Sequence, residues 1–232
     1  MSRLAAFLAG VAAVVSAAWV AVAPEHSGLP LLLAAMGLIV AGAAWLETGS
    51  GASKEIVLVA TLAAVAAAGR VLFVAIPGVQ PVTVIVVAAG AALGARAGFA
   101  TGALAALASN FFLGQGPWTP WQMLGWGACG LVGSALAPLL RGRVPFAAVC
   151  FVLGFAFSGM MDIWLWVAFW PHTWQALTVV IGQGIPYEAA HAIGNVVIAL
   201  AIGPELKRLL ERYARRLRTE VVWADSPLPQ SP

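Results

Sequence analysis

Charged residues are scarce in this sequence: Asp, Glu, Lys and Arg together make up 9% of its 232 residues, whereas an ordinary soluble domain carries about 25%. Hydrophobic residues make up 62%. Water does not keep such a chain soluble, so we expect a lipid bilayer to be its solvent. The alternation of polar and apolar residues that a transmembrane β-barrel requires is absent from runs such as 60–68. We therefore predict an all-α polytopic membrane protein of the bacterial inner (plasma) membrane.

Cysteine and the common catalytic motifs are equally scarce. The two cysteines, Cys129 and Cys150, lie in apolar runs without a Cys-x-x-Cys spacing, which indicates neither a disulfide framework nor a thiolate metal site. The sequence has no Gly-x-x-x-x-Gly-Lys-Ser/Thr loop for ATP, no His-Glu-x-x-His and no Gly-x-Ser-x-Gly. An intramembrane aspartyl protease needs two aspartates, and only Asp162 lies in an apolar segment. We predict a non-enzyme without cofactor, metal ion or nucleic-acid partner.

Eight apolar segments approach the length of about 20 residues that a helix needs to cross the hydrocarbon core. They span residues 4–22, 29–46, 55–76, 82–95, 98–113, 120–140, 145–170 and 175–202. Only Gly94, Arg96 and Gly98 separate the fourth segment from the fifth. The first segment also resembles a signal peptide, but its length and the proline at position 24 favour an uncleaved helix.

Basic residues predict the topology, because the cytoplasmic loops of membrane proteins are enriched in Lys and Arg. With the N-terminus in the cytoplasm, the loops on that side carry Arg3, Lys54, Arg96, Arg141, Arg143 and the basic tail. The opposite loops, around residues 25, 78, 115 and 172, carry no Lys or Arg. We expect an even number of crossings, with both termini in the cytoplasm.

The chain divides into three parts on this pattern. We expect two N-terminal transmembrane helices in residues 1–50, a six-helix core in residues 51–204 and a basic tail in residues 205–232. Residues 205–218 place leucines on one helical face and six basic residues around them. This pattern fits an amphipathic helix held on the membrane by anionic lipid, and it fits a solvated flank of the last span equally well. The end, 223–232, is rich in Pro and Ser and is expected to be disordered.

Polar side chains inside a membrane are costly, and they mark function more often than they do in soluble proteins. Arg70 lies near the end of the third segment, just before the turn 76–81 with its two prolines and one glycine. Its guanidinium group could bind an anion or a polar ligand, or reach the outer membrane surface by snorkelling. The prolines and the glycine interrupt the helix in this turn, and interrupted backbone at membrane depth is tolerated only beside protein or a water-filled cavity. A plain surface turn just outside the bilayer is an equal alternative for residues 76–81.

A second polar and aromatic region, residues 109–122, separates the fifth and sixth segments. Three amides and two tryptophans stand close together in it: Asn110, Gln115, Trp118, Trp121 and Gln122. An interfacial aromatic belt explains the tryptophans, but it does not explain the amides and the four Gly and Pro residues beside them. We interpret this loop as a surface on which a ligand stacks and forms hydrogen bonds.

The last two segments also carry polar groups. Asp162 stands among tryptophans and needs a cationic partner such as Arg70, a cavity or a proton. Positions 188, 191 and 195 form a stripe of Glu, His and Asn on one helical face. A Glu-x-x-His pair ligates metal in helix bundles together with a second copy, which the sequence lacks.

Small residues form two further patterns. Ala60, Ala64 and Ala68 follow one face of the third segment, and glycines recur at every fourth position from 90 to 102. Such faces let helices approach closely. They serve either packing within the protein or the docking of a membrane partner.

Two stretches carry a resemblance to a known family. The first is Gly-Arg-Val-Leu-Phe at 69–73 with the turn that follows to 81, and the second is Ala-Ser-Asn-Phe-Phe at 108–112 with Gly-Pro-Trp-Thr-Pro-Trp-Gln at 116–122. With them, residues 54–207 resemble the substrate-binding S-component of energy-coupling-factor (ECF) vitamin transporters, and most closely the cobalamin-type group. The resemblance implies a six-helix core, to which the first two helices are extra.

The resemblance also implies a function and partners. It implies that a vitamin or related micronutrient binds near the outer surface, with cobalamin or a corrinoid precursor as the preferred substrate and riboflavin or a deazapurine as alternatives. A separate transmembrane coupling protein would dock on Ala60, Ala64 and Ala68, and two ATPase subunits would supply the energy. The substrate-binding residues expected on this basis are Arg70, Phe73, Gln80, Asn110, Gln115, Trp118, Trp121, Gln122, Asp162, Trp166, Trp170, Glu188, His191 and Asn195.

Two other classes of function stay open at this point. A secondary transporter that acts alone usually contains an internal repeat, and we find no clear repeat in the sequence. A membrane-bound enzyme or assembly factor would use the polar stripe at 188, 191 and 195.

Overall fold

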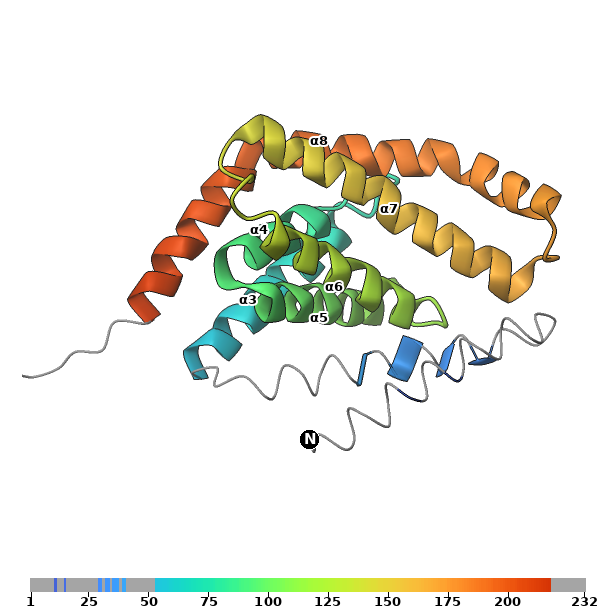
Figure 1. The fold of residues 1–232 in the computed structure, drawn as a ribbon, viewed down its shortest axis with the longest axis horizontal. Helices are drawn as coiled ribbons and strands as arrows, with labels where there is room; N and C mark the ends of the chain where they lie inside the picture. The colour runs from blue at the N-terminus through green and yellow to red at the C-terminus, as the bar shows by residue number, and fades with distance from the viewer. Residues whose placement is uncertain are drawn as a thin grey trace, which may run out of the picture.

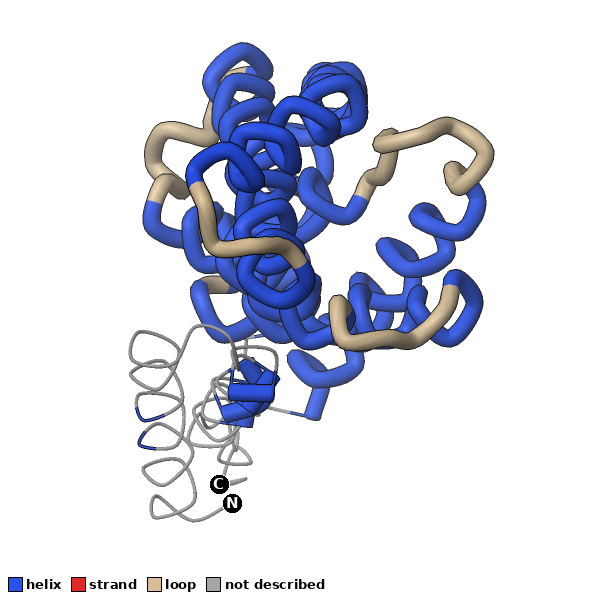
Figure 2. The backbone as a smooth tube through the Cα atoms, turned by 90° about the vertical axis from the view of Figure 1, so that its right-hand side faces the viewer, coloured by secondary structure: helices blue, strands red, loops and turns tan. Residues whose placement is uncertain are grey.

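The computed structural model describes residues 53–217, together with positions 11, 15, 29–30, 32–33, 35–37 and 39–40. Residues 53–217 form six α-helices joined by short loops, with no strand among them (Figures 1 and 2). The helices are α3 (Ser53–Leu72), α4 (Val82–Leu93), α5 (Ala95–Leu113), α6 (Thr119–Ala135), α7 (Arg143–Phe169) and α8 (Trp174–Leu217). Apart from the isolated positions, the helices expected at 4–22 and 29–46, the cleavage site and the tail end at 223–232 lie outside the described residues.

The expectation of an all-helical protein suited to a membrane is confirmed for the described residues. α3, α7 and α8 are each long and apolar enough to cross a bilayer. α4 has only 12 residues, which at 1.5 Å per residue reach roughly 18 Å of a hydrocarbon core about 30 Å thick. The segment predicted at 82–95 is therefore too short to be a full crossing.

Prolines shorten two helices relative to the prediction. α3 ends at Leu72 instead of residue 76, because in a continuing helix the ring of Pro77 would clash with the carbonyl group of Phe73. α6 ends at Ala135 instead of residue 140. Pro138 follows within one turn of that end, where its fixed φ and missing N–H oppose further helix.

Two other boundaries differ from the prediction. Gly94 alone separates α4 from α5, with a φ of 99° that favours glycine, so Arg96 lies inside α5. The tail is not a separate helix, because α8 continues through Pro204 to Leu217. Figure 1 shows the last part of α8 (red) at a steep angle to the rest (orange), which is the kind of bend that an internal proline produces.

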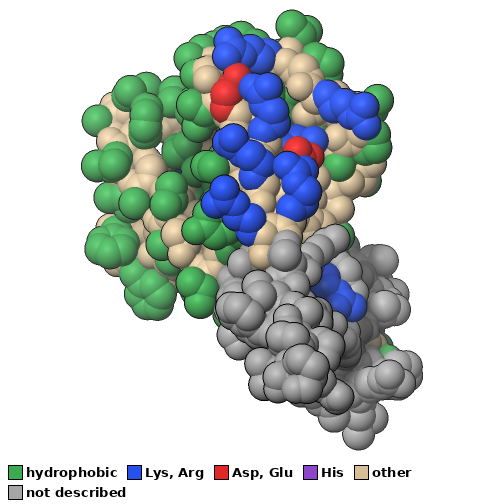
Figure 3. Space-filling model, turned by 90° about the vertical axis from the view of Figure 1, so that its left-hand side faces the viewer, with side chains coloured by type: hydrophobic (Ala, Val, Ile, Leu, Met, Phe, Trp, Pro, Cys, Tyr) green, Lys and Arg blue, Asp and Glu red, His purple; other side chains and the backbone are tan. Residues whose placement is uncertain are grey.

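Basic side chains gather at one end of the molecule (Figure 3). The last part of α8 contributes Arg208, Arg212 and Arg215, which line a shallow hollow together with Glu205. Arg143 at the start of α7 joins them, with its Nη2 2.7 Å from Glu205 Oε1. Arg208, Arg212 and Arg215 of the predicted tail therefore lie on a helix, and Arg143 at the start of α7 shares Glu205 with Arg208.

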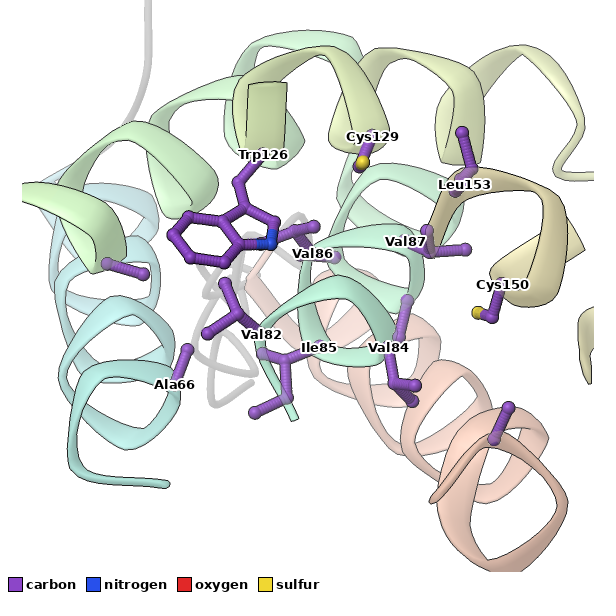
Figure 4. Close-up of a cluster of buried hydrophobic side chains, with 14 of the residues drawn as sticks. Ala66, Val82, Val84, Ile85, Val86, Val87, Trp126, Cys129, Cys150 and Leu153 are labelled. Atoms are coloured by element: carbon purple, nitrogen blue, oxygen red, sulfur yellow. The ribbon is translucent and has the colours of Figure 1, made fainter. Parts of the chain in front are cut away.

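α4 is the centre of the helix packing, and it contacts each of the other five helices between residues 53 and 217. Every residue from Val82 to Gly90 is buried, as expected for a helix that is apolar on all sides. Figure 4 shows Val82 and Val86 beside the indole ring of Trp126 from α6. Trp126 is fully buried and stacks on Phe157 of α7, with 4.3 Å between the ring centroids.

Glycines allow α4, α5 and α6 to approach closely. A Cβ atom on Gly90 would lie 1.9 Å from the carbonyl oxygen of Gly130, and one on Gly98 would lie 2.6 Å from Cα of Gly90. Gly102 is equally close to the backbone of α6. The glycines at positions 90, 98 and 102 thus serve packing within the protein, whereas Ala60, Ala64 and Ala68 on α3 are exposed.

We predict that Gly90→Ala destabilises the protein, because the added Cβ has no space against Gly130. Overpacking of this kind typically costs about 1–3 kcal/mol. Gly182→Ala in α8 is the matched control, since a Cβ there would meet nothing within 4 Å. Thermal unfolding in detergent measures both variants, and a Gly90→Ala melting temperature equal to that of the wild type would contradict this packing.

Candidate functional site

A cavity of about 350 Å³ lies beside the turn between α3 and α4. Its lining comes from the end of α3, the following turn, the end of α5 and the middle of α8, and it consists of Arg70, Phe73, Val74, Ile76, Pro77, Gly78, Val79, Gln80, Leu113 and Tyr187. Three of these side chains are polar, and Gln80 Nε2 donates to Tyr187 Oη at 3.4 Å. The cavity is at the lower end of the range of about 300–1,000 Å³ that is typical of small-molecule sites.

Arg70 is the only charged residue among those that line this cavity. Its Nε donates to Gln80 Oε1 at 2.8 Å, and its Nη1 donates to Ser109 Oγ at 2.7 Å and to Asn110 Oδ1 at 2.6 Å. The guanidinium carbon also lies 4.9 Å from the centroid of the Trp126 ring, in the range of a cation–π interaction. Groups from the α3–α4 turn, α5 and α6 therefore fix the direction of the side chain.

Every hydrogen-bond acceptor of Arg70 in the described part of the chain is neutral. Among residues 53–217, Arg70 forms no ion pair with a carboxylate, and none of its hydrogen bonds there uses Nη2. The pairing with Asp162 that the sequence left open does not form. The guanidinium group is thus held by three neutral side chains, and its Nη2 hydrogens and positive charge have no partner of opposite charge within residues 53–217.

Asn110 connects Arg70 to the second polar loop. It is 1% exposed, and its Nδ2 donates to Thr119 Oγ1 at 2.9 Å and to Gln122 Oε1 at 2.7 Å. Thr119 donates in turn to Gln115 Oε1 at 2.8 Å. The two stretches that we expected to form one site are therefore joined by hydrogen bonds, but Asn110 lies behind the cavity lining and acts by positioning Arg70.

His191 holds the other side of the α3–α4 turn. Its Nδ1 donates to the Gly78 carbonyl oxygen at 2.7 Å, so Nε2 is the acceptor, 3.5 Å from Thr83 Oγ1 and 3.4 Å from Asn195 Nδ2. Gly78 has a φ of 77°, and a Cβ there would lie 2.8 Å from the Tyr187 carbonyl oxygen. Only glycine fits this position. Both nitrogens of His191 have partners, and the residue fixes the turn from outside the cavity lining.

The tryptophans that we expected around a ligand lie elsewhere. Trp118 and Trp166 donate their Nε1 hydrogens to backbone carbonyls of adjacent loops, at 3.3 and 3.0 Å. Trp121 lines a separate apolar groove of about 400 Å³ together with residues of α7, and Trp170 is the C-cap of α7. The structure therefore brings Arg70, Phe73 and Gln80 together at the cavity but keeps these four tryptophans out of its lining.

Asp162 and Glu188 form a separate contact between α7 and α8. A buried oxygen of each residue, Asp162 Oδ2 and Glu188 Oε1, has no hydrogen-bond partner within the described residues. Asp162 Oδ2 also lies against Gly184, where a Cβ would be 2.6 Å away. Neither carboxyl group belongs to the cavity lining.

Three members of the site were missing from the sequence prediction. Trp126 and Thr83 lie in apolar runs that nothing in the sequence distinguishes, and the Trp126 Nε1 donates to Thr83 Oγ1 at 3.3 Å in the interior. Tyr187 precedes His191 by one helical turn. That spacing was the one signal that could have placed it beside the turn.

Comparison with known proteins yields a family but no characterised relative. A family model described as a family of unknown function, DUF6580, matches residues 50–212, which is more than half of the chain. The match includes α3, α4, α5, α6 and α7 completely. No curated protein and no solved structure matches the chain.

We predict that Asn110→Ala lowers the melting temperature, because it removes hydrogen bonds to Arg70, Thr119 and Gln122. A buried polar group that loses its partner costs about 1–3 kcal/mol. Gln183→Ala is the control, since Gln183 is an exposed amide of α8. If both variants unfold at the wild-type temperature in the same detergent, the interpretation of Asn110 as a positioning residue is wrong.

Proposed function

The chain belongs to DUF6580, a family of unknown function, and we propose that it is the substrate-binding S-component of an ECF-type ABC transporter. In this proposal, the cavity beside Arg70 binds a vitamin or related micronutrient at the outer face of the membrane. Partner subunits then drive uptake with ATP. The observation that carries the proposal is that one helix, α3, ends at a solute-sized cavity and presents an open face of small residues.

The composition of the cavity supports a binding role. Small-molecule sites are largely apolar and contain a few polar groups that orient the ligand. Here Arg70, Gln80 and Tyr187 supply hydrogen-bonding groups, while Phe73 and Leu113 supply apolar walls. Phe73 is 38% exposed, so its ring is accessible for stacking on a ligand.

The alanine face supports a docking role. Ala60, Ala64 and Ala68 are exposed, whereas Ala63 and Ala66 on the other side of α3 are 3% and 0% exposed. Small residues at every fourth position let a second membrane helix approach closely. We propose that the ECF transmembrane coupling protein docks on this face. The absence of an ATP-binding motif in the sequence agrees with a division of labour in which two separate ATPase subunits supply the energy.

The proposed architecture is a core of six helices, α3 to α8, with two further transmembrane helices before it. We place the protein in the bacterial inner membrane with both termini in the cytoplasm. The gathering of Arg143, Arg208 and Arg212 at one end of the molecule supports this orientation. The same basic surface is suited to contact with anionic lipid headgroups.

The volume of the cavity constrains the identity of the substrate. The preference for a corrinoid came from the tryptophan-rich loop, but Trp118 and Trp121 do not line the cavity. A volume of about 350 Å³ suits a compound of one or two rings better than a corrinoid macrocycle. We therefore propose a smaller vitamin-like substrate.

One observation favours a second function. The neighbouring carboxyl groups of Asp162 and Glu188 lie between two helices long enough to span a membrane, and intramembrane carboxyl groups occur in the proton relays of secondary transporters. A secondary transporter would take up its substrate without ATPase partners and in response to a proton gradient. Uptake measured with and without the partners distinguishes the two functions.

We predict that Ala64→Leu and Ala68→Leu abolish co-purification with the ECF coupling protein of the same organism, because the larger side chains prevent close helix approach. Ala201→Leu is the control, because Ala201 is an exposed alanine of α8 outside the proposed face. Affinity purification from cells that express all four subunits measures the complex. Undiminished complex formation in both α3 variants, or none with the wild type, would argue against docking on α3.

We also predict the topology. Reporter fusions at Arg141 and after residue 218 should give cytoplasmic signals, and a fusion at His172 should give a periplasmic signal, because the positive-inside rule assigns the basic loops to the cytoplasm. A periplasmic signal from either of the first two fusions would refute the proposed orientation.

A further inference from the structure

The hydrogen bonds of Arg70 determine which of its donors are left for a ligand. A guanidinium group has five N–H donors. Gln80 uses the one on Nε, while Ser109 and Asn110 use the two on Nη1. The two donors on Nη2 are used by no hydrogen bond within residues 53–217. Nη2 is therefore the nitrogen of Arg70 whose donors no described residue uses.

The charge of Arg70 has no counter-ion in the described part of the protein. Hydrogen bonds to neutral oxygens and the ring of Trp126 stabilise the cation in part, but a partly buried charge is most stable when it is paired. A positive charge that is held in place, and that lines a cavity without a carboxylate beside it, is complementary to an anionic group.

A second donor lies beside Arg70 in the same cavity. The Tyr187 hydroxyl accepts a hydrogen bond from Gln80, so its own hydrogen is left to donate. Phe73, Ile76 and Leu113 form apolar parts of the lining. The cavity thus combines two polar donors, one of them cationic, with walls suited to a ring or a short aliphatic body.

We infer that the ligand is a small organic anion, whose carboxylate or phosphate oxygen accepts hydrogen bonds from Arg70 Nη2 and Tyr187 Oη. This inference rests on the proposed role of the cavity as a substrate site, and it narrows that role to acidic micronutrients. A purely structural role for Arg70, as a tie between α3 and α5, predicts no preference for charge in the ligand. Matched acidic and neutral compounds separate the two cases.

The experiment measures the binding of three matched pairs to the full chain in detergent by ligand-dependent thermal shift. The pairs are nicotinate with nicotinamide, pantothenate with panthenol, and pyridoxine 5′-phosphate with pyridoxine. Each pair keeps the body of the molecule and changes the charge. The first two pairs test a carboxylate, and the third tests a phosphate.

At least one anion should bind, and its neutral partner should bind at least about 10-fold more weakly, the loss typical of a hydrogen bond to a charged group. Arg70→Lys should keep the preference for the anion at lower affinity, Arg70→Gln should remove the preference, and Tyr187→Phe should weaken binding several-fold while keeping it. The inference is overturned if the wild type binds none of the anions, or binds neutral partners equally well. It is also overturned if folded Arg70→Gln keeps the preference.

The wild-type comparison decides the matter even if Arg70→Gln does not fold, because it needs no variant. Uptake assays with the coupling protein and ATPases distinguish this inference from the proposed function. Partner-dependent uptake of a neutral compound alone would overturn the inference and leave the S-component function in place. Binding of an anion without partner-dependent uptake would support the inference and count against the S-component function.

Discussion

The candidate site depends on how the guanidinium group of Arg70 is held. Neutral oxygens of Gln80, Ser109 and Asn110 fix it in direction, and the ring of Trp126 supports it from one side. Because none of these partners carries a negative charge, the cation is oriented without being neutralised. The same contacts join the end of α3 to the α3–α4 turn, α5 and α6. They therefore determine both the shape of the cavity and the position of its charge.

This arrangement requires helices that approach closely. α4 contacts all of the other five helices between residues 53 and 217, and the contact of Gly90 with Gly130 brings α4 and α6 together at the level of the backbone. On the opposite side, His191 and the tight fit of Gly78 attach the turn to α8. The apolar packing around α4 therefore holds the helices in place, while the hydrogen-bonded polar side chains around Arg70 supply the charge and the hydrogen bonds of the site.

The sequence predicted the features that depend on residue type. It was less informative about the features that depend on the direction in which each side chain points. The scarcity of charge predicted a helical membrane protein. Arg70 and Asn110 were singled out as polar residues between or within apolar segments, Gln80 was expected from the family resemblance, and hydrogen bonds join the three residues. The four tryptophans expected around a ligand lie outside the lining of this cavity, because aromatic character does not show which way a loop turns its rings. Trp126 was not predicted, because a tryptophan in an apolar run does not reveal which polar groups its ring contacts. His191 was predicted to bind a ligand, and in the structure its Nδ1 donates to the Gly78 carbonyl oxygen of the turn.

The central claim is that Arg70 presents an unneutralised charge to the ligand, and mass spectrometry of the small molecules that co-purify with the full chain tests it most directly. The account predicts an enriched organic acid or phosphate ester in the wild type. The same compound should be absent from Arg70→Gln and present in Arg208→Gln, which removes an exposed arginine of α8. A neutral compound as the enriched molecule, or equal enrichment of the acid in Arg70→Gln, would contradict the account.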